Sequence, residues 1–275
     1  MNVLPLSSSG RSAEEVARLC AREAARIIMA GFGGRQEIRV KGRGNFVTEA
    51  DLQSERAVLD ILRSEYPQHF VLSEETANGW TSGLGEGADA GWLWVIDPLD
   101  GTHNYCQGIP YFAFNLALCR GEEPRLALTY APATQEEFFA LAGGGLRANG
   151  RPARVSDVGA LKESVLGVDL GYDDRRAAGL IDLLAELWPG MQSLRVMGSA
   201  ALGLAYAACG RYDLFVHRFL YPWDTAAGLL LVREGGGAVV EPEGGPAGLR
   251  SQAVVAGAPA AVEDFLRLAK GKGGR

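Results

Sequence analysis

Trp94-Val-Ile-Asp-Pro-Leu-Asp-Gly-Thr-His-Asn104 is the most informative segment of this 275-residue chain. It begins inside an apolar run, residues 92–96, which is typical of a strand buried on both faces. Asp97 follows at the carboxyl end of that strand, where α/β proteins tend to bind their ligands. Pro98 fits the second position of a tight turn, which would fold Asp100 back beside Asp97. The segment therefore predicts two neighbouring carboxylates at the edge of a buried sheet.

These two carboxylates predict a cation site. Asp97 and Asp100 would repel each other unless one of them were protonated or a cation lay between them. Oxygen ligands of this kind suit Mg²⁺ or Mn²⁺ better than Zn²⁺. Gly101 and Thr102 then offer backbone N–H groups at a predicted helix start, which favours the binding of a phosphate. The alternative is that Asp97–Gly101 is only a polar turn, because short motifs also occur by chance.

Three more acidic segments lie at the ends of predicted elements. Glu74 and Glu75 follow a short strand, and the alternative there is a solvated loop. Asp224 precedes a predicted helix, where it could be a plain N-cap. Thr48 and Asp51 could form a Thr-x-x-Asp variant of the capping box. Together these segments place several carboxylates at element ends, and that pattern favours a metal site.

The composition argues against several classes of protein. The chain has 27 basic and 33 acidic residues, and the resulting net charge of −6 disfavours a nucleic-acid-binding face. No apolar run approaches the length of a membrane span, and the N-terminus lacks the form of a signal peptide, so we expect no membrane association. The four cysteines are scattered, which is typical of reduced thiols in a cytoplasmic protein.

The order of the predicted elements indicates a layered α+β or α/β fold. In the first half we expect helices over 12–30 and 48–64, strands over 37–41, 69–72, 92–96, 111–119, 125–131 and 137–142, and an exposed loop over 77–91. A hairpin at Asn149-Gly150 suggests a division near residue 155. In the second half we expect strands over 164–169, 193–196, 213–216, 237–241 and 252–256, and helices over 175–187, 199–209, 225–235 and 259–269. The chain is therefore predicted to comprise an N-terminal α+β half, 1–155, and a C-terminal α/β half, 156–275.

From about residue 12 to 268 the chain resembles the inositol monophosphatase superfamily, the Mg²⁺-dependent, lithium-sensitive sugar phosphatases. Its strongest motifs are residues 94–104 and Trp223-Asp-Thr-Ala-Ala-Gly228. Val47-Thr-Glu-Ala-Asp51 and Ser73-Glu-Glu-Thr76 match the two upstream blocks of the family in the same order. The resemblance implies an αβαβα sandwich, a homodimer, and a metal site between the two halves.

The resemblance also implies a role for individual residues. The implied metal ligands are Glu74, Asp97, the Leu99 carbonyl, Asp100 and Asp224. They would hold two or three Mg²⁺ ions, with Mn²⁺ as a substitute. The implied catalytic residues are Glu74, Asp51 and Thr102, the last two orienting and deprotonating the attacking water. The implied substrate contacts are Gly101, Thr102 and His103 for the phosphate and Gly198, Ser199, Ala200 and position 217 for the rest of the substrate.

These residues lead us to expect hydrolysis of a small polyol or sugar monophosphate by metal-activated water. Inositol 1-phosphate is the first candidate substrate. The alternative activities on the same fold are those of fructose 1,6-bisphosphatase, histidinol-phosphatase and 3′-phosphoadenosine 5′-phosphate phosphatase. A hypothesis of another class is a non-catalytic regulatory or binding protein. That hypothesis predicts the loss of a metal ligand or of the water-orienting pair. The sequence retains every implied metal ligand as well as Asp51 and Thr102.

Position 217 departs from the pattern of inositol-specific members, which carry Glu seven residues before the last metal ligand. Here it is His217, followed by Arg218. An imidazole is no fixed anionic acceptor, so the pair could instead favour a second phosphate or a carboxylate. The alternative is that both side chains simply end a strand and face water. Tyr172 lies in a loop that could also reach the pocket.

Overall fold

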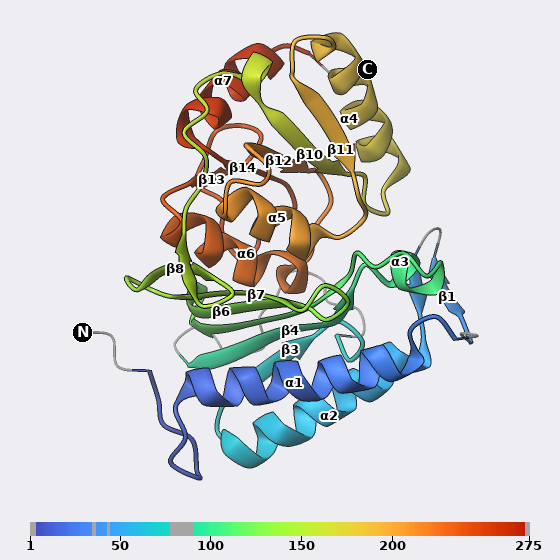
Figure 1. Cartoon of the computed structure of the whole chain (residues 1–275), viewed down its shortest axis with the longest axis vertical. Coiled ribbons are helices and arrows are strands. Elements are labelled where there is room, and N and C mark those ends of the chain that lie inside the picture. The colour runs from blue at the N-terminus through green and yellow to red at the C-terminus, as the bar shows by residue number, and fades with distance from the viewer. Residues whose placement is uncertain (1–3, 35–36, 43–44, 78–90, 273–275) are drawn as a thin grey trace.

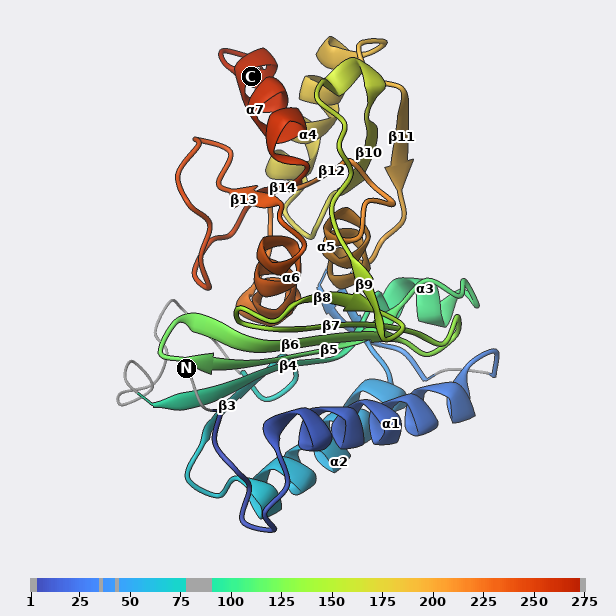
Figure 2. The same cartoon turned by 60° about the vertical axis from the view of Figure 1, so that its left-hand side comes forward.

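Two sheets and three pairs of helices alternate along the long axis of the molecule (Figures 1 and 2). The structure is a computed structural model that describes residues 4–34, 37–42, 45–77 and 91–272. The loop predicted over 77–91 falls almost entirely outside this range. The layers follow in the order α1 and α2, a seven-stranded sheet, α5 and α6, a five-stranded sheet, then α4 and α7. This is the αβαβα sandwich that the family resemblance implies.

The first helical layer begins at two capping boxes. Helix α1 (Ala13–Gly31) starts after Ser12, whose N–H donates to Glu15 Oε2 at 2.8 Å while its Oγ accepts the Glu15 N–H at 3.2 Å. Helix α2 (Glu49–Glu65) starts after Thr48 in a similar way. Both helices begin within one residue of the predicted position, because the side chains that satisfy their first N–H groups are local in sequence.

The seven-stranded sheet has its strands in sequence order. They are β3 (Phe70–Ser73), β4 (Trp92–Asp100), β5 (Ala113–Arg120), β6 (Glu123–Ala131), β7 (Glu136–Leu141), β8 (Gly145–Ala148) and β9 (Arg151–Ala153). Only the β3–β4 pair is parallel among the pairs of this sheet. Asn149 and Gly150, with φ of 50° and 73°, form the predicted hairpin between β8 and β9. A separate hairpin pairs β1 (Arg39–Gly42) with β2 (Asn45–Val47).

Both faces of this sheet are buried, as the apolar run in β4 predicts. Trp94 and Ile96 belong to the core shared with α1 and α2, whereas Leu93 and Val95 belong to the core shared with the second helical layer. Successive residues of a strand point to opposite faces, so one strand serves two cores.

The five-stranded sheet has the order β11-β10-β12-β14-β13. Its strands are β10 (Val165–Asp169), β11 (Ser193–Val196), β12 (Leu214–His217), β13 (Ala238–Val240) and β14 (Val254–Gly257). Strand β10 is parallel to both of its neighbours, and β14 is antiparallel to both of its own. A 3₁₀ turn, η1 (Leu161–Glu163), precedes β10.

The middle and outer layers contain α4 (Asp174–Leu187), α5 (Ala200–Ala208), α6 (Pro222–Glu234) and α7 (Pro259–Ala269). The short helix α3 (Thr102–Cys106) follows β4 and belongs to neither layer. Helix α5 is buried on nearly every side, as expected of an apolar helix between two sheets. Helix α6 packs on strands of the first sheet although it lies in the second half of the chain. In the described part of the chain, no helix is long and apolar enough to cross a membrane.

Candidate active site

The carboxylates of Asp97 and Asp100 lie together because β4 contains a bulge. In the pairing with β5, Asp97 is opposite Asn115 and Asp100 is opposite Ala113, so β4 has one extra residue across this step. Residues three apart in a regular strand point to opposite faces, and the extra residue brings them to the same one. The tight turn predicted at Pro98 is therefore wrong. Proline has no N–H to pair, and a bulge is where a central strand tolerates it.

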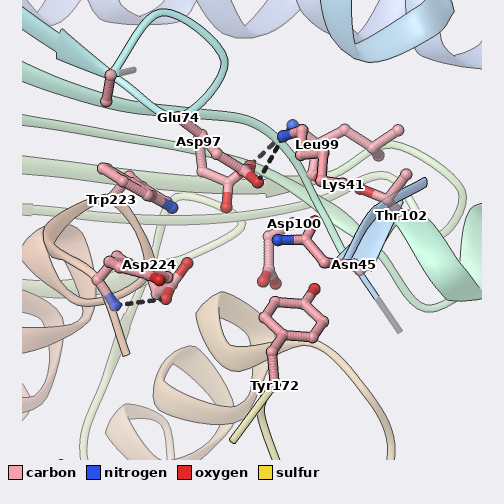
Figure 3. Close-up of a pocket in the computed structure, with 13 residues that line it drawn as sticks. Lys41, Asn45, Glu74, Asp97, Leu99, Asp100, Thr102, Tyr172, Trp223 and Asp224 are labelled. Carbon is pink, nitrogen blue, oxygen red and sulfur yellow. Dashed lines mark hydrogen bonds and ion pairs between the residues drawn. The ribbon is translucent and has the colours of Figure 1, made fainter. Parts of the chain in front are cut away.

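Asp224 completes a group of three converging carboxylates (Figure 3). One oxygen from each of Asp97, Asp100 and Asp224 lies within 4.8 Å of the other two. Burial and the carboxylates of Glu74, Asp100 and Asp224 raise the pKa of Asp97 well above its usual range. Burial and the neighbouring Asp100 do the same for the pKa of Asp224. Three carboxylates this close carry a strong mutual repulsion, which a bound cation would relieve.

Asp224 lies inside α6 and not before it. The helix begins at Pro222, whose fixed φ suits the first helical position. Asp224 is the third residue of the helix, and its Oδ2 accepts the Tyr221 N–H at 2.7 Å. The predicted helix start at residue 225 is therefore wrong, and so is the alternative in which Asp224 is a plain N-cap, although the carboxylate does lie in the first turn of the helix.

Glu74 lines the same cavity and forms an ion pair there. Lys41 Nζ lies 3.2 Å from Glu74 Oε1 and 2.6 Å from Glu75 Oε1. Burial raises the pKa of Glu74 to about 7, although Lys41 partly offsets this effect. Lys41 belongs to β1 and to none of the motifs, so its place in the site was missed. The basic strand around it, residues 37–41, is the only signal of it in the sequence.

Asp51 and Thr102 are in contact, as the resemblance implies. Thr102 Oγ1 lies 2.9 Å from Asp51 Oδ1 and 2.9 Å from the Leu99 carbonyl oxygen. Asp51 Oδ2 accepts the Thr48 N–H at 2.8 Å and also the Thr48 hydroxyl, which is the predicted capping box. Asp51 is completely buried, and this burial raises its pKa.

Gly101 joins the bulge of β4 to the first turn of α3. Its φ is +88°, and a Cβ there would lie 3.1 Å from the Tyr111 carbonyl oxygen and 3.2 Å from that of Gly198. Only glycine fits this position without displacing backbone. The N–H groups at the start of a helix have no partner within it, so this turn can bind an anion. Gly101 and Thr102 line the cavity that contains the carboxylates, and His103 lines the next one.

Two adjoining cavities make up the site. The first, of about 220 Å³, contains the carboxylates, and the second, of about 280 Å³, opens beside it. They share Asp100, Gly101, Tyr172 and Asp224. The other predicted substrate contacts, Gly198, Ser199, Ala200 and His217, all line the second cavity. The structure thus brings every predicted site residue to these two cavities or, for Asp51, into contact with Thr102.

His217 is buried, with 4% of its surface exposed, so the alternative in which it faces water is wrong. Its Nδ1 accepts the Phe219 N–H at 3.1 Å. Burial lowers the pKa of His217 to about 3. The imidazole is therefore neutral near pH 7 and offers no positive charge to a second phosphate.

The comparison with known families agrees with this geometry. A sequence profile described as the inositol monophosphatase family matches residues 11–271. The chain belongs to the inositol monophosphatase family. Among its relatives are the Nus factor SuhB of Pseudomonas aeruginosa, 38% identical over 88% of this chain and 90% of that protein, and the inositol monophosphatase of Dictyostelium discoideum, 35% identical over 90% and 91%.

Solved structures of inositol monophosphatase relatives have the same fold. The extragenic suppressor protein suhB from Bartonella henselae has a TM-score of 0.85 at 31% identity, covering 94% of this chain and 98% of that one. The IMPase from Thermotoga maritima has a TM-score of 0.83 at 29% identity, covering 94% and 96%. The chain is accordingly a phosphoric monoester hydrolase of the inositol monophosphatase family, which is metal-dependent.

The residues of the site fit a divalent metal ion. The converging groups are oxygen donors, which hard cations prefer. Among the residues that the structure describes, Lys41 is the only cationic side chain lining the first cavity, against four acidic ones. A single ammonium cannot neutralise four neighbouring carboxylates, so the donor set suits a bound cation.

Two further residues line these cavities of the inositol monophosphatase fold. Tyr172 follows β10, and its side chain lies beside Asp100 in both cavities (Figure 3). Asp169 lines the second cavity, and burial raises its pKa to about 7. Asp169 was missed, yet it is the last residue of a strand predicted over 164–169. The carboxyl ends of parallel strands are where such folds gather ligand-binding residues, so this signal was present in the sequence.

Proposed function

We propose that this protein is a Mg²⁺-dependent phosphomonoesterase acting on a small polyol phosphate, with inositol 1-phosphate as the first candidate. The observation that carries the proposal is the convergence of the Asp97, Asp100 and Asp224 carboxylates within 4.8 Å of one another. This group opens into the same cavity as Thr102, whose hydroxyl contacts Asp51.

The proposed metal ligands are Glu74, Asp97, the Leu99 carbonyl, Asp100 and Asp224. Their oxygen atoms suit Mg²⁺, with Mn²⁺ as a substitute. When bound, two or three such ions would supply positive charge to the phosphoryl oxygens and lower the pKa of a nearby water. In the chain without metal, Lys41 forms an ion pair with Glu74, and the first turn of α5 donates hydrogen bonds to Asp100.

Asp51 and Thr102 are proposed to receive the proton of the attacking water. When the Thr102 hydroxyl donates to Asp51 Oδ1 at 2.9 Å, its oxygen keeps lone pairs that can accept from a water in the cavity. Burial raises the pKa of Asp51, which makes this carboxylate a better proton acceptor than an exposed one. The proton therefore has a path from the cavity, through Thr102, to a fully buried base.

The backbone at the start of α3 is proposed to bind the phosphate. Gly101, Thr102 and His103 place their N–H groups in the first turn of the helix, next to the acidic cavity. These N–H groups carry the positive end of the peptide dipoles and favour an anion. The phosphorus would then lie between this turn and the carboxylates.

The second cavity is proposed to hold the alcohol part of the substrate. In the described part of the chain, no lysine or arginine lines it, and His217 is neutral near pH 7. A second phosphate or a carboxylate would be buried there without a counter-charge, at a high cost in free energy. This supports the phosphate monoester of an uncharged polyol over fructose 1,6-bisphosphate and 3′-phosphoadenosine 5′-phosphate. Gly198, Ser199 and Ala200 allow a close approach, because their side chains are small.

Phosphate release measured with Mg²⁺ and with EDTA tests this function. The substrates would be inositol 1-phosphate, fructose 1,6-bisphosphate, histidinol phosphate and 3′-phosphoadenosine 5′-phosphate. We expect metal-dependent release that is fastest from inositol 1-phosphate. His217→Gln, which keeps an acceptor for the Phe219 N–H, should change KM for this ester and leave kcat nearly unchanged. Release that is fastest from a bisphosphate would contradict the assignment of the second cavity.

A regulatory role is the second candidate, because several relatives carry the name Nus factor SuhB at 35–38% identity. In this case the chain would bind a partner protein through its surface and turnover would be secondary. No release from any of the four esters by a protein that binds Mg²⁺ would favour this role over the enzymatic one.

We further propose that the protein is a homodimer of the cytoplasm. The four cysteines are all free, which suits a reducing compartment. Ile109, Val196 and Met197 are 46%, 56% and 39% exposed. They lie near one another, because Asn104 bonds to the backbone of both Ile109 and Met197. Such a patch suits an interface between copies, and sedimentation of the wild type and of Val196→Glu would test it.

A further inference from the structure

The backbone N–H groups of the turn before α5, residues 197–199, all donate hydrogen bonds to one buried carboxylate. Asp169, at the end of β10, is 6% exposed. Its Oδ1 accepts the N–H of Gly198 at 2.6 Å and that of Met197 at 3.2 Å, and its Oδ2 accepts the N–H of Ser199 at 3.2 Å. Three successive N–H groups thus converge on a single side chain, which fixes the path of the turn.

The carbonyl side of the same turn is held by Asn104, which comes from α3. Its Nδ2 donates to the carbonyl oxygens of Met197 at 2.7 Å and Gly198 at 3.2 Å, and to that of Tyr111 at 2.8 Å. Gly198 has a φ of +83°, and a Cβ there would lie 3.2 Å from Asn104 Nδ2. The turn therefore has room only for glycine at its centre, between the two side chains that hold it.

This turn and the start of α5 bind Asp100, one of the proposed metal ligands. The Ser199 hydroxyl donates to Asp100 Oδ2. The Ala201 N–H donates to the same oxygen at 3.1 Å, and the Ala200 N–H donates to Oδ1 at 3.3 Å. Every one of these donors belongs to the turn or to the first residues of α5. The position of the Asp100 carboxylate thus depends on the position of the turn.

We propose that Asp169 and Asn104 are positioning residues, which clamp the 197–199 turn and thereby aim the Asp100 carboxylate at the metal ion. The inference rests on the proposed function, in which Asp100 is a ligand. Asp169 belongs to the five-stranded sheet, whereas Asp100 ends β4 of the seven-stranded sheet and Asn104 lies in α3, which follows β4. The clamp therefore also sets the register of the two halves where they meet at the site.

Asp169→Asn tests the clamp with little change in volume, because an amide keeps one acceptor oxygen and turns a second one into a donor. Asp213→Asn is the matched control. Asp213 is also buried and also accepts a backbone N–H, that of Val165 at 2.6 Å, but this residue starts β10 whereas Asp169 ends it. Both variants should lose stability, and only the first should change the metal site.

Calorimetric titration with Mn²⁺ gives a readout that needs no substrate. We expect Asp169→Asn to weaken Mn²⁺ binding by about 10- to 100-fold, the range for losing a residue that orients a metal ligand. Asp213→Asn should bind Mn²⁺ as the wild type does. Saturating Mg²⁺ should restore much of the kcat of Asp169→Asn, because the defect lies in the affinity for the metal.

Mn²⁺ affinities of Asp169→Asn and wild type within twofold of each other would overturn the proposal, whatever the change in melting temperature. If Asp169→Asn does not fold, Asn104→Ala tests the other side of the clamp against the same expectation. A wild type that binds Mn²⁺ and hydrolyses no ester would refute the proposed function, while the titrations would still decide whether the clamp sets metal affinity.

Discussion

Replacing Thr102 by valine isolates the proposed proton path. The two side chains have the same shape, and valine lacks the hydroxyl that lies 2.9 Å from Asp51 Oδ1. Thr48 makes a natural control, because its hydroxyl bonds to the other oxygen of the same carboxylate and it does not line either cavity of the site. Thr102→Val and Thr48→Val therefore remove equivalent bonds from one buried base, and only the first removes a group that faces the cavity.

The two variants should agree in stability and differ in turnover. Removing a hydrogen-bond donor from a fully buried carboxylate costs about 1–3 kcal/mol of unfolding free energy, and this applies to both. Losing a positioned proton acceptor costs about 10²- to 10⁴-fold in rate. That factor corresponds to about 3–5 kcal/mol of activation free energy, and it should appear in Thr102→Val alone.

Urea unfolding and phosphate release at saturating Mg²⁺ would measure the two quantities. We expect kcat of Thr48→Val to stay within a few-fold of wild type and that of Thr102→Val to fall by at least 100-fold. If both variants lost kcat to the same extent, Thr102 would act only by orienting Asp51. If Thr102→Val kept most of its kcat, the proton would take another path.

Three further predictions concern charge and packing. Folding raises the pKa of Glu74 to about 7 and that of Asp100 to about 6, so without metal the folded chain binds more protons than the unfolded one. In EDTA the melting temperature should therefore fall as pH rises from about 4.5 to 7, and a rise would contradict this sign. Asp97→Asn should abolish turnover and raise the melting temperature in EDTA at pH 7, because it removes one of three repelling carboxylates; near-full activity would exclude Asp97 as a metal ligand. Gly228→Ala would place a Cβ 2.4 Å from Leu204 Cδ1 and should cost about 1–3 kcal/mol in urea unfolding, whereas Gly248→Ala meets nothing within 4 Å; equal midpoints would refute the packing argument.

Features of the fold that depend on neighbouring residues could be predicted from the sequence. Strand 193–196 and helix 259–269 match their predicted bounds, and the capping box at Ser12 fixes the start of α1. The strand predicted over 92–96 runs on to Asp100, because a bulge keeps it paired with β5. A bulge depends on the register of two strands, and no local pattern encodes that register.

The site could be predicted as far as its motifs extend. Asp51, Asp97, Thr102 and Asp224 lie in such motifs, and the structure brings them together. Lys41 and Asp169 were missed because their roles depend on partners far along the chain: Glu74 for one and residues 197–199 for the other. For His217 the sequence left open whether the side chain lines the pocket or faces water, because its burial depends on how the strands of the second sheet are ordered.

The shared middle layer has a consequence for the synthesis of the protein. The seven-stranded sheet is complete at Ala153, yet the helix that covers much of its second face ends only at Glu234. Ribosomes add about 5–20 residues per second, so the roughly 80 intervening residues leave an apolar sheet face bare for about 4–16 seconds. During that interval the nascent chain presents a surface that chaperones bind. A fragment ending near residue 155 would keep this face exposed, and we expect it to aggregate when expressed alone.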